Sequence, residues 1–227
     1  GFALYGLPFF YDHYIKEFGW TRATVTSANA FGKLLVAPMF GFIAGWIIDK
    51  YGPRRMLMTG AFLTAVALIG LSLMKSLGIF YISYVFVALG YVFGGPLPCQ
   101  VLISRWFTKN RGKAMGIAYL GIGTGGFLVP LIAAALINNA GWRDALLYIG
   151  ILIILIALPF ALFVKNSPVR GDIAVNPEPA VPIKSILKNP YFYLLALGSM
   201  CSIGAVGGVN QHLKLYLNDL HYTQAQA

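Results

Sequence analysis

The sequence is poor in charge and in cysteine, and each shortage excludes a class of protein. Only 11% of its 227 residues are charged, while 58% are apolar and the mean hydropathy is +0.72. A soluble protein of this length could not bury that much apolar surface, so the composition predicts that lipid is the solvent. The two cysteines, Cys99 and Cys201, lie far apart in apolar segments, which excludes a disulfide framework and a cysteine-based metal site.

Sequence signals for other chemistry are missing as well. The sequence contains no catalytic triad, phosphate-binding loop or metal-ligand cluster, so we predict no enzyme activity, no cofactor and no metal. The net charge of +10 does not indicate nucleic-acid binding. The basic residues fall between apolar segments rather than in one patch, and no recognition motif accompanies them.

Long apolar segments dominate the sequence instead. We expect seven membrane-spanning helices, over residues 1–11, 23–48, 56–74, 78–103, 112–137, 142–164 and 190–217. The first has 11 residues, about 16 Å of helix against a bilayer core of about 30 Å, so we expect a truncated span. The predicted fold class is therefore an all-α polytopic membrane helix bundle.

The basic residues predict the orientation of this bundle. Eleven of the 17 Lys and Arg fall on one side of the alternating spans and five on the other, and Lys33 alone lies inside a span. By the positive-inside rule, residues 50–55, 109–113 and 165–189 are predicted to be cytoplasmic.

A charged turn separates the second and third spans. It reads Gly-x-x-x-Asp-Lys-x-Gly-x-Arg-Arg, with Gly45, Asp49, Lys50, Gly52, Arg54 and Arg55 at the defined positions. This pattern resembles the signature loop of the major facilitator superfamily. The resemblance implies that the turn is a conformational switch in which Asp49 holds the cytoplasmic gate shut. A carboxylate suits that role, because it stabilises the N-terminus of a facing helix.

The same resemblance implies a domain organisation of two six-span halves joined by a cytoplasmic linker. Residues 1–164 would form the N-terminal six-helix half, residues 165–189 the proline-rich linker, and residues 190–227 the incomplete first helix of the C-terminal half. The expected partners are the lipid bilayer, the remainder of the C-terminal half and a small-molecule substrate.

The start of the fifth span narrows the resemblance. Residues 107–121 read Phe-x-Lys-x-Arg-x-x-Ala-x-Gly-x-Ala-x-x-Gly, which is similar to a motif of the monocarboxylate porters and oxalate/formate exchangers. That branch implies an organic anion as substrate. In animal monocarboxylate porters a lysine follows the first-span proline, whereas Phe9 follows Pro8 here. Proton coupling through that lysine is therefore not implied.

Lys33 is the clearest residue-level indication of a substrate. Arg22, Thr26, Asn29 and Lys33 are spaced by four, three and four residues, so they share one face of the second span. All seven acidic residues lie in loops or at span ends. An intramembrane cation marks a substrate or ion path by default, so we predict that Lys33 and Asn29 bind the substrate. The alternative is an inert lysine whose side chain reaches outward to the headgroups.

Three further residues complete the predicted binding set: Tyr5 in the first span, and Asn210 and His212 in the seventh. Glycines precede Asn210 and would permit local unwinding there. The alternative for all three is a polar or aromatic helix end that meets the membrane interface.

The fourth span contains Gly94, Gly95, Pro96 and Pro98. Each proline removes a backbone donor and clashes with the preceding turn, so we predict a helix break. Such a break either presents freed carbonyls to a binding site or is a packing kink between neighbouring helices.

The predicted function is secondary active transport of a small solute by alternating access, with an organic anion such as a monocarboxylate as substrate, alone or with a coupling proton or ion. Two alternatives stay open. One is proton-coupled efflux of drugs or metabolites, which is disfavoured because the fifth span lacks the Gly-Pro pair of such antiporters. The other is a non-transporting membrane sensor on the same fold. The predicted location is a cell membrane, namely the cytoplasmic membrane of a prokaryote.

Overall fold

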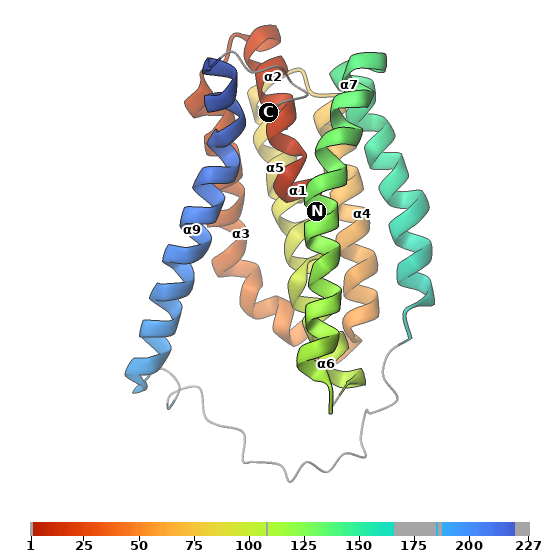
Figure 1. Cartoon of the computed structure of the whole chain (residues 1–227), viewed down its shortest axis with the longest axis vertical. Coiled ribbons are helices and arrows are strands. Elements are labelled where there is room, and N and C mark those ends of the chain that lie inside the picture. Colours follow the sequence, from red (N-terminus) through yellow and green to blue (C-terminus); the bar gives the residue numbers. More distant parts are fainter. Residues whose placement is uncertain (1, 108, 166–184, 186–187, 221–227) are drawn as a thin grey trace.

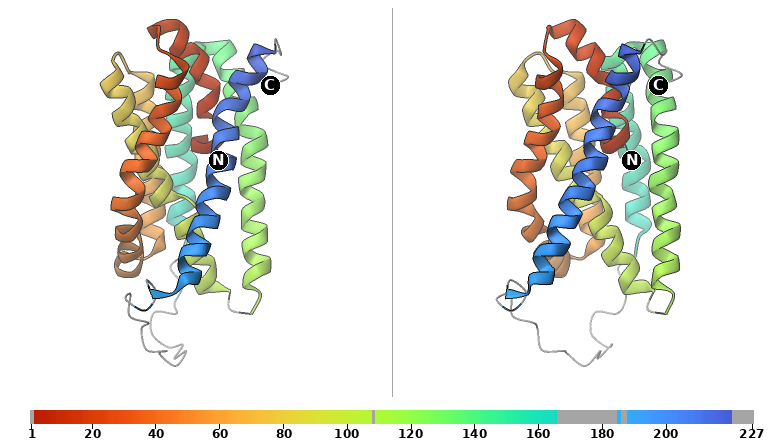
Figure 2. Two further views of the ribbon diagram at one scale, coloured as in Figure 1. Left: turned by 90° about the vertical axis from the view of Figure 1, so that its left-hand side faces the viewer. Right: turned by 60° about the vertical axis from the view of Figure 1, so that its left-hand side comes forward.

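The computed structural model describes residues 2–107, 109–165, 185 and 188–220, and the regular elements in these ranges are all helices (Figure 1). The long ones are α3 (Arg22–Tyr51), α4 (Pro53–Ser72), α5 (Leu77–Gly94), α6 (Pro96–Trp106), α7 (Arg111–Phe163) and α9 (Pro190–Asp219). They run side by side, and successive spans alternate in direction, with α6 continuing in the direction of α5 and α7 folding back on itself (Figure 2). The predicted all-α membrane bundle is confirmed.

The first predicted span is not one helix. Residues 2–11 fold as α1 (Phe2–Tyr5), the 3₁₀ helix η1 (Leu7–Phe10) and the start of α2 (Tyr11–Phe18), so helical structure continues past the predicted end at residue 11. The interruption has a local cause, because Pro8 near the start of η1 has no backbone N–H to continue an α-helical ladder.

Four helical segments are long and apolar enough to cross a membrane: Pro53–Ser72, Leu77–Trp106, Arg111–Phe163 and Pro190–Val209. Helix α3 adds a fifth if its arms Arg22–Val36 and Met39–Tyr51, bent by 49°, count as one span. The 53-residue helix α7 contains two arms separated at Gly141, which has φ 81° and ψ 163°. The first predicted span, which is broken near Pro8, is not among these segments of the described chain.

Two glycines with positive φ form turns that join helices directly. Gly52 has φ 82° and ψ 158°, ends α3 and is followed at once by Pro53, the first residue of α4. A side chain at this φ would be strained, so glycine permits a turn with no intervening loop. Gly141 does the same inside α7, which folds back on itself in Figure 1.

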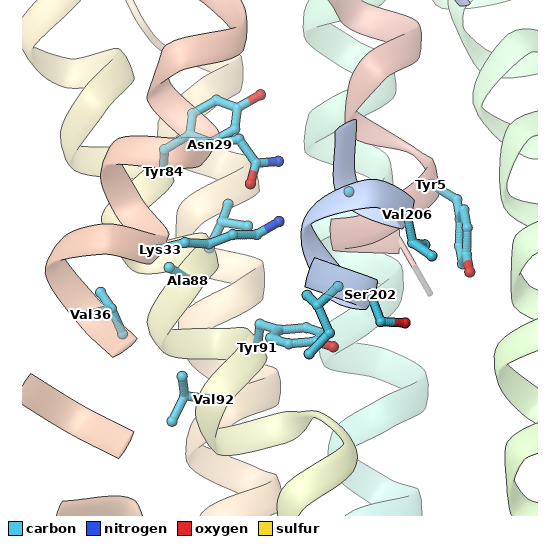
Figure 3. A pocket seen from close by; sticks show the side chains of 13 residues that line it. Tyr5, Asn29, Lys33, Val36, Tyr84, Ala88, Tyr91, Val92, Ser202 and Val206 are labelled. Atoms are coloured by element: carbon cyan, nitrogen blue, oxygen red, sulfur yellow. The ribbon is translucent and has the colours of Figure 1, made fainter. Parts of the chain in front are cut away.

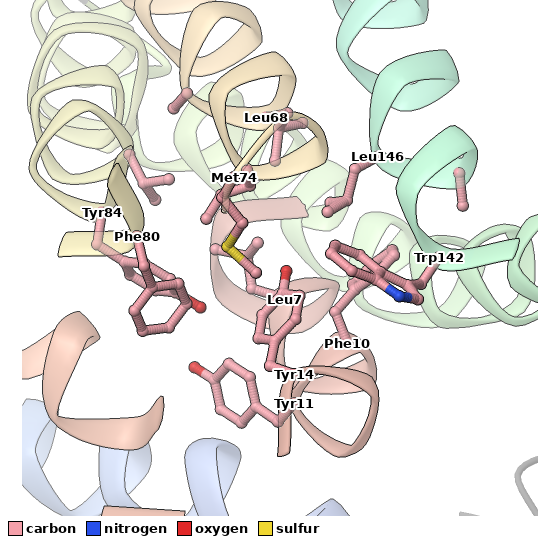
Figure 4. Close-up of a cluster of buried hydrophobic side chains, with 14 of the residues drawn as sticks. Leu7, Phe10, Tyr11, Tyr14, Leu68, Met74, Phe80, Tyr84, Trp142 and Leu146 are labelled. Carbon is pink, nitrogen blue, oxygen red and sulfur yellow. The ribbon is translucent and has the colours of Figure 1, made fainter. Parts of the chain in front are cut away.

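An aromatic core fills the end of the bundle where α2, α4, α5 and α7 meet (Figure 4). Tyr14 lies at its centre, with ring centroids 5.6 Å from Phe80 and 5.2 Å from Trp142, both edge to face. Such pairs are favourable beyond their buried area, so this core fixes how the first span sits against α5 and α7.

A polar network covers the same core. The carboxylate of Glu17 on α2 accepts hydrogen bonds from the Trp142 indole at 2.7 Å and the Arg143 guanidinium at 2.8 Å. Arg143 also donates to the carbonyls of Ser72 and Met74, at 2.9 and 3.0 Å. One arginine therefore ties α2, the end of α4 and the second arm of α7 together.

This network predicts a dependence of stability on pH. The hydrogen bond from Arg143 lowers the pKa of Glu17 below its usual 4.5. Because the pKa of Glu17 is lower in the folded state, its ionised carboxylate contributes stability that is present above pH 4.5 and is lost as the pH falls through the lower value.

We expect Glu17→Gln to lower the Tm of the full-length protein at pH 7, and the difference in Tm from the wild type to shrink below pH 4.5. The Glu17 side chain is 42% exposed, so the effect stays below about 1 kcal/mol. Thermal unfolding in detergent between pH 3.5 and 7 checks this, and a gap independent of pH would contradict it.

Helices α4 and α5 approach closely at glycines. A Cβ at Gly60 would collide with the backbone of Gly94, and a Cβ at Gly90 would collide with Thr64. Small residues of this kind let membrane helices pack backbone against backbone.

We expect Gly60→Ala to destabilise the protein by about 1–3 kcal/mol, because the methyl group forces the two backbones apart. The matched control is Gly78→Ala on α5, where no described atom lies within 4 Å of the added Cβ. A lowered Tm for Gly60→Ala beside an unchanged Tm for Gly78→Ala is the expected outcome. An equal Tm in the two variants would show that α4 and α5 have room for a methyl group at Gly60.

Candidate functional site

A cavity of about 500 Å³ lies between α3, α5 and α9, with Tyr5 of α1 at its side. Its polar lining residues are Tyr5, Asn29, Lys33, Tyr84, Tyr91 and Ser202. The remaining lining is aliphatic or glycine. A mostly apolar cavity with a few convergent polar groups is the usual form of a small-molecule site.

Helix α3 supplies the charged group of this cavity. The helix starts at Thr21, whose side chain accepts a hydrogen bond from the backbone N–H of Thr24, and it places Asn29 and Lys33 one turn apart. Figure 3 shows the amide of Asn29 and the amine of Lys33 directed into the space that α9 borders with Ser202 and Val206. The structure thus brings together three of the predicted binding residues: Lys33, Asn29 and Tyr5.

No Asp or Glu occurs among the described residues that line this cavity. Removing a charged lysine from water is unfavourable, and these lining residues provide no carboxylate as a counter-charge. An anionic ligand bound next to Lys33 would supply that counter-charge. Lys33 also lies 11 residues past Arg22, about 16 Å along the helix, which is far for its amine to reach the helix end.

The two predicted binding residues of α9 are not among the described residues that line this cavity. His212 is exposed on α9 and does not line it. Asn210 belongs to the α9 backbone, but its side chain lies outside the described part of the chain. The α9 segment that does line the cavity contains Ser202, Ile203, Val206 and Gly207, one to two turns earlier in the helix.

Three polar lining residues were missed from the sequence: Tyr84, Tyr91 and Ser202. Tyr84 and Tyr91 are seven residues apart on α5 and therefore share a helix face, a signal that could have been read. Ser202 carries no such signal, because a single hydroxyl in an apolar helix does not indicate which face meets a cavity.

The predicted helix break lies elsewhere. Helix α5 ends at Gly94, α6 begins at Pro96, and Gly95 between them is extended with φ −93° and ψ −151°. These residues line a second cavity of about 630 Å³ between α4, α5, α6 and α7, where Gln100 donates a hydrogen bond to the Tyr119 hydroxyl. Of the break residues, none lines the cavity that contains Lys33.

The predicted switch residues lie at the other end of α3. Asp49 accepts a hydrogen bond from Arg105 at the end of α6, at 3.2 Å. Lys50 lies over the rings of Trp46 and Tyr51, 4.8 and 5.4 Å from their centroids. No described atom lies within 4 Å of a Cβ built at Gly45, and Gly52 forms the turn into α4, the helix that begins with Pro53, Arg54 and Arg55. Arg105 was missed, because 56 residues separate it from Asp49 in the sequence.

Comparisons with known proteins agree on one family. The profile of the Major Facilitator Superfamily matches residues 1–227. The chain is 29% identical over 195 residues to an agnestins efflux protein of Paecilomyces divaricatus, which covers 83% of this chain and 43% of that protein. It is 28% identical over 200 residues to monocarboxylate transporter 13 of Bos taurus, covering 83% and 44%. It is 25% identical over 198 residues to a membrane sensor protein of Salmonella typhimurium, covering 78% and 45%.

The chain therefore spans less than half the length of these relatives. Most of the relatives are eukaryotic, so the comparisons give no support to the predicted prokaryotic cytoplasmic membrane. The apolar helices and the family match do support an integral membrane protein.

Proposed function

Because this chain belongs to the Major Facilitator Superfamily, a family of transporters, we propose that it forms part of a secondary active transporter of a small organic anion that works by alternating access. The observation that carries this proposal is Lys33, a cation in a largely apolar cavity whose described lining contains no carboxylate. Charge-assisted hydrogen bonds from an ammonium to a carboxylate are among the stronger polar interactions, and a low dielectric strengthens them.

We also propose that the chain is organised in three consecutive parts. Residues 1–164 form the N-terminal six-helix half, residues 165–189 link it to the second half, and residues 190–227 begin that half. The linker falls largely outside the described residues. Cavity lining from both α3 and α9 supports a substrate site between the two halves. The name of the bovine relative, a monocarboxylate transporter, supports an anion.

Uptake into proteoliposomes tests this function. The full-length protein is expected to accumulate labelled benzoate or pyruvate above protein-free liposomes, and the neutral amide of the same acid should compete poorly. Equal competition by acid and amide would contradict an anion site.

Efflux is the second candidate, because a relative is named as an efflux protein. Measuring flux under pH gradients of opposite sign across the proteoliposome membrane distinguishes uptake from efflux. Binding of the probe without any flux would instead favour a sensor, the role for which the Salmonella relative is named.

A further inference from the structure

The outer ends of α3 and α9 are joined by an ion pair. The guanidinium of Arg22 donates from both terminal nitrogens to both carboxylate oxygens of Asp219, each at 2.6 Å. Arg22 is the first residue of α3 and Asp219 is the last residue of α9. The parallel two-bond geometry is the most directional form of an arginine–carboxylate contact.

This pair lies above the cavity that contains Lys33. Helices α3 and α9 are antiparallel, and the C-terminal end of α9 lies beside the start of α3 (Figure 1). Lys33 follows Arg22 by 11 residues and Gly207 precedes Asp219 by 12, so each lies about 16–18 Å along its helix from the pair. The two helices that wall the cavity are therefore held together at one end.

The pair differs in its connectivity from two other ion pairs of the bundle. Asp49–Arg105 and Glu17–Arg143 each join elements that precede residue 164. Arg22–Asp219 joins such an element to α9, which follows the linker. When the two sides of a transporter rock against each other, contacts within one side persist, whereas a contact between the sides breaks.

We propose that Arg22 and Asp219 form the outer gate of the cavity: the pair holds the cavity closed on the side of Arg22, and it separates when the cavity opens to that side. This inference rests on the alternating-access part of the proposed function and not on the charge of the substrate. Both side chains are about half exposed, 54% and 52%, so the pair shifts the equilibrium between the closed and open cavity only modestly.

Cysteine accessibility in the full-length protein tests the gate. Cys99→Ser and Cys201→Ser, with serine at any further cysteine of the full-length protein, remove the native thiols, and Ser202→Cys places a reporter in the cavity wall. An impermeant maleimide is then added separately to each face of the membrane. Arg22→Gln and Asp219→Asn are each expected to speed labelling from the face that carries Arg22 by up to about fivefold, the upper end for an exposed pair. The charge-swapped double variant, Arg22→Asp with Asp219→Arg, should restore slow labelling.

Glu17→Gln is the matched control, because it breaks an ion pair at the same end of the bundle without joining α9. It should leave the labelling rate unchanged. Unchanged labelling in both single variants would overturn the gate, and so would a charge-swapped variant that labels as fast as the single ones. Labelling needs no substrate, so a failure here is distinct from a failure of anion transport.

Discussion

Replacing Lys33 by glutamine is expected to raise the KM for a transported carboxylate at least about tenfold, since a hydrogen bond to a charged group contributes roughly 1.5–3 kcal/mol. Glutamine keeps most of the side-chain length but removes the charge, so the cavity retains its shape and loses its attraction for an anion. Lys33→Arg keeps the charge and should retain partial function. The measurement is the concentration dependence of uptake in proteoliposomes.

Lys16→Gln is the control for this experiment, because Lys16 is exposed on α2 and is not among the described lining residues of the cavity. Its KM should match the wild type. If Lys33→Gln transports the same carboxylate with unchanged KM and rate, Lys33 is a structural residue and the anion site loses its main support.

Asp49→Asn should reduce the maximal transport rate by about fivefold and leave the KM within about twofold. The change removes a charge that acts through a helix N-terminus or an ion pair, effects of about 0.3–2 kcal/mol on a two-state equilibrium. Asp49 is far from the substrate cavity, so its effect falls on the rate of switching and not on binding. Its side chain is 80% exposed, so thermal stability should change little.

The hydrogen bond to Arg105 allows a sharper version of this test. If the pair acts as a unit, Arg105→Gln should lower the rate as Asp49→Asn does, and the double variant should lose little more than either single one. Asp144→Asn, at the opposite end of the bundle, serves as control. A wild-type rate in Asp49→Asn would remove the switching role.

The sequence was informative wherever the determining chemistry is local. Apolar length predicts the bundle, and the missing backbone donors of Pro96 and Pro98 account for an interruption between α5 and α6. The spacing of Asn29 and Lys33 places them on one face, and both line the cavity. The same local rule applied to Pro8 would have found the interruption in the first span.

Long-range partners could not be predicted in this way. Arg22 and Asp219 are 197 residues apart, and no periodicity relates them. The face of α9 that meets the cavity depends on how that helix is rotated against α3, which is set by packing and not by its own pattern. For that reason the prediction selected His212, which does not line the cavity, and missed Ser202, which does.

The central claim is that an anion passes through the cavity walled by Lys33 and Ser202. It is tested most directly by substrate protection of a Ser202→Cys thiol in the full-length protein, with Cys99 and Cys201 replaced by serine. Saturating carboxylate substrate is expected to slow modification of this thiol severalfold, and the matching neutral amide should not. Equal rates with carboxylate, amide and no addition, in protein that still transports the carboxylate, would contradict the account.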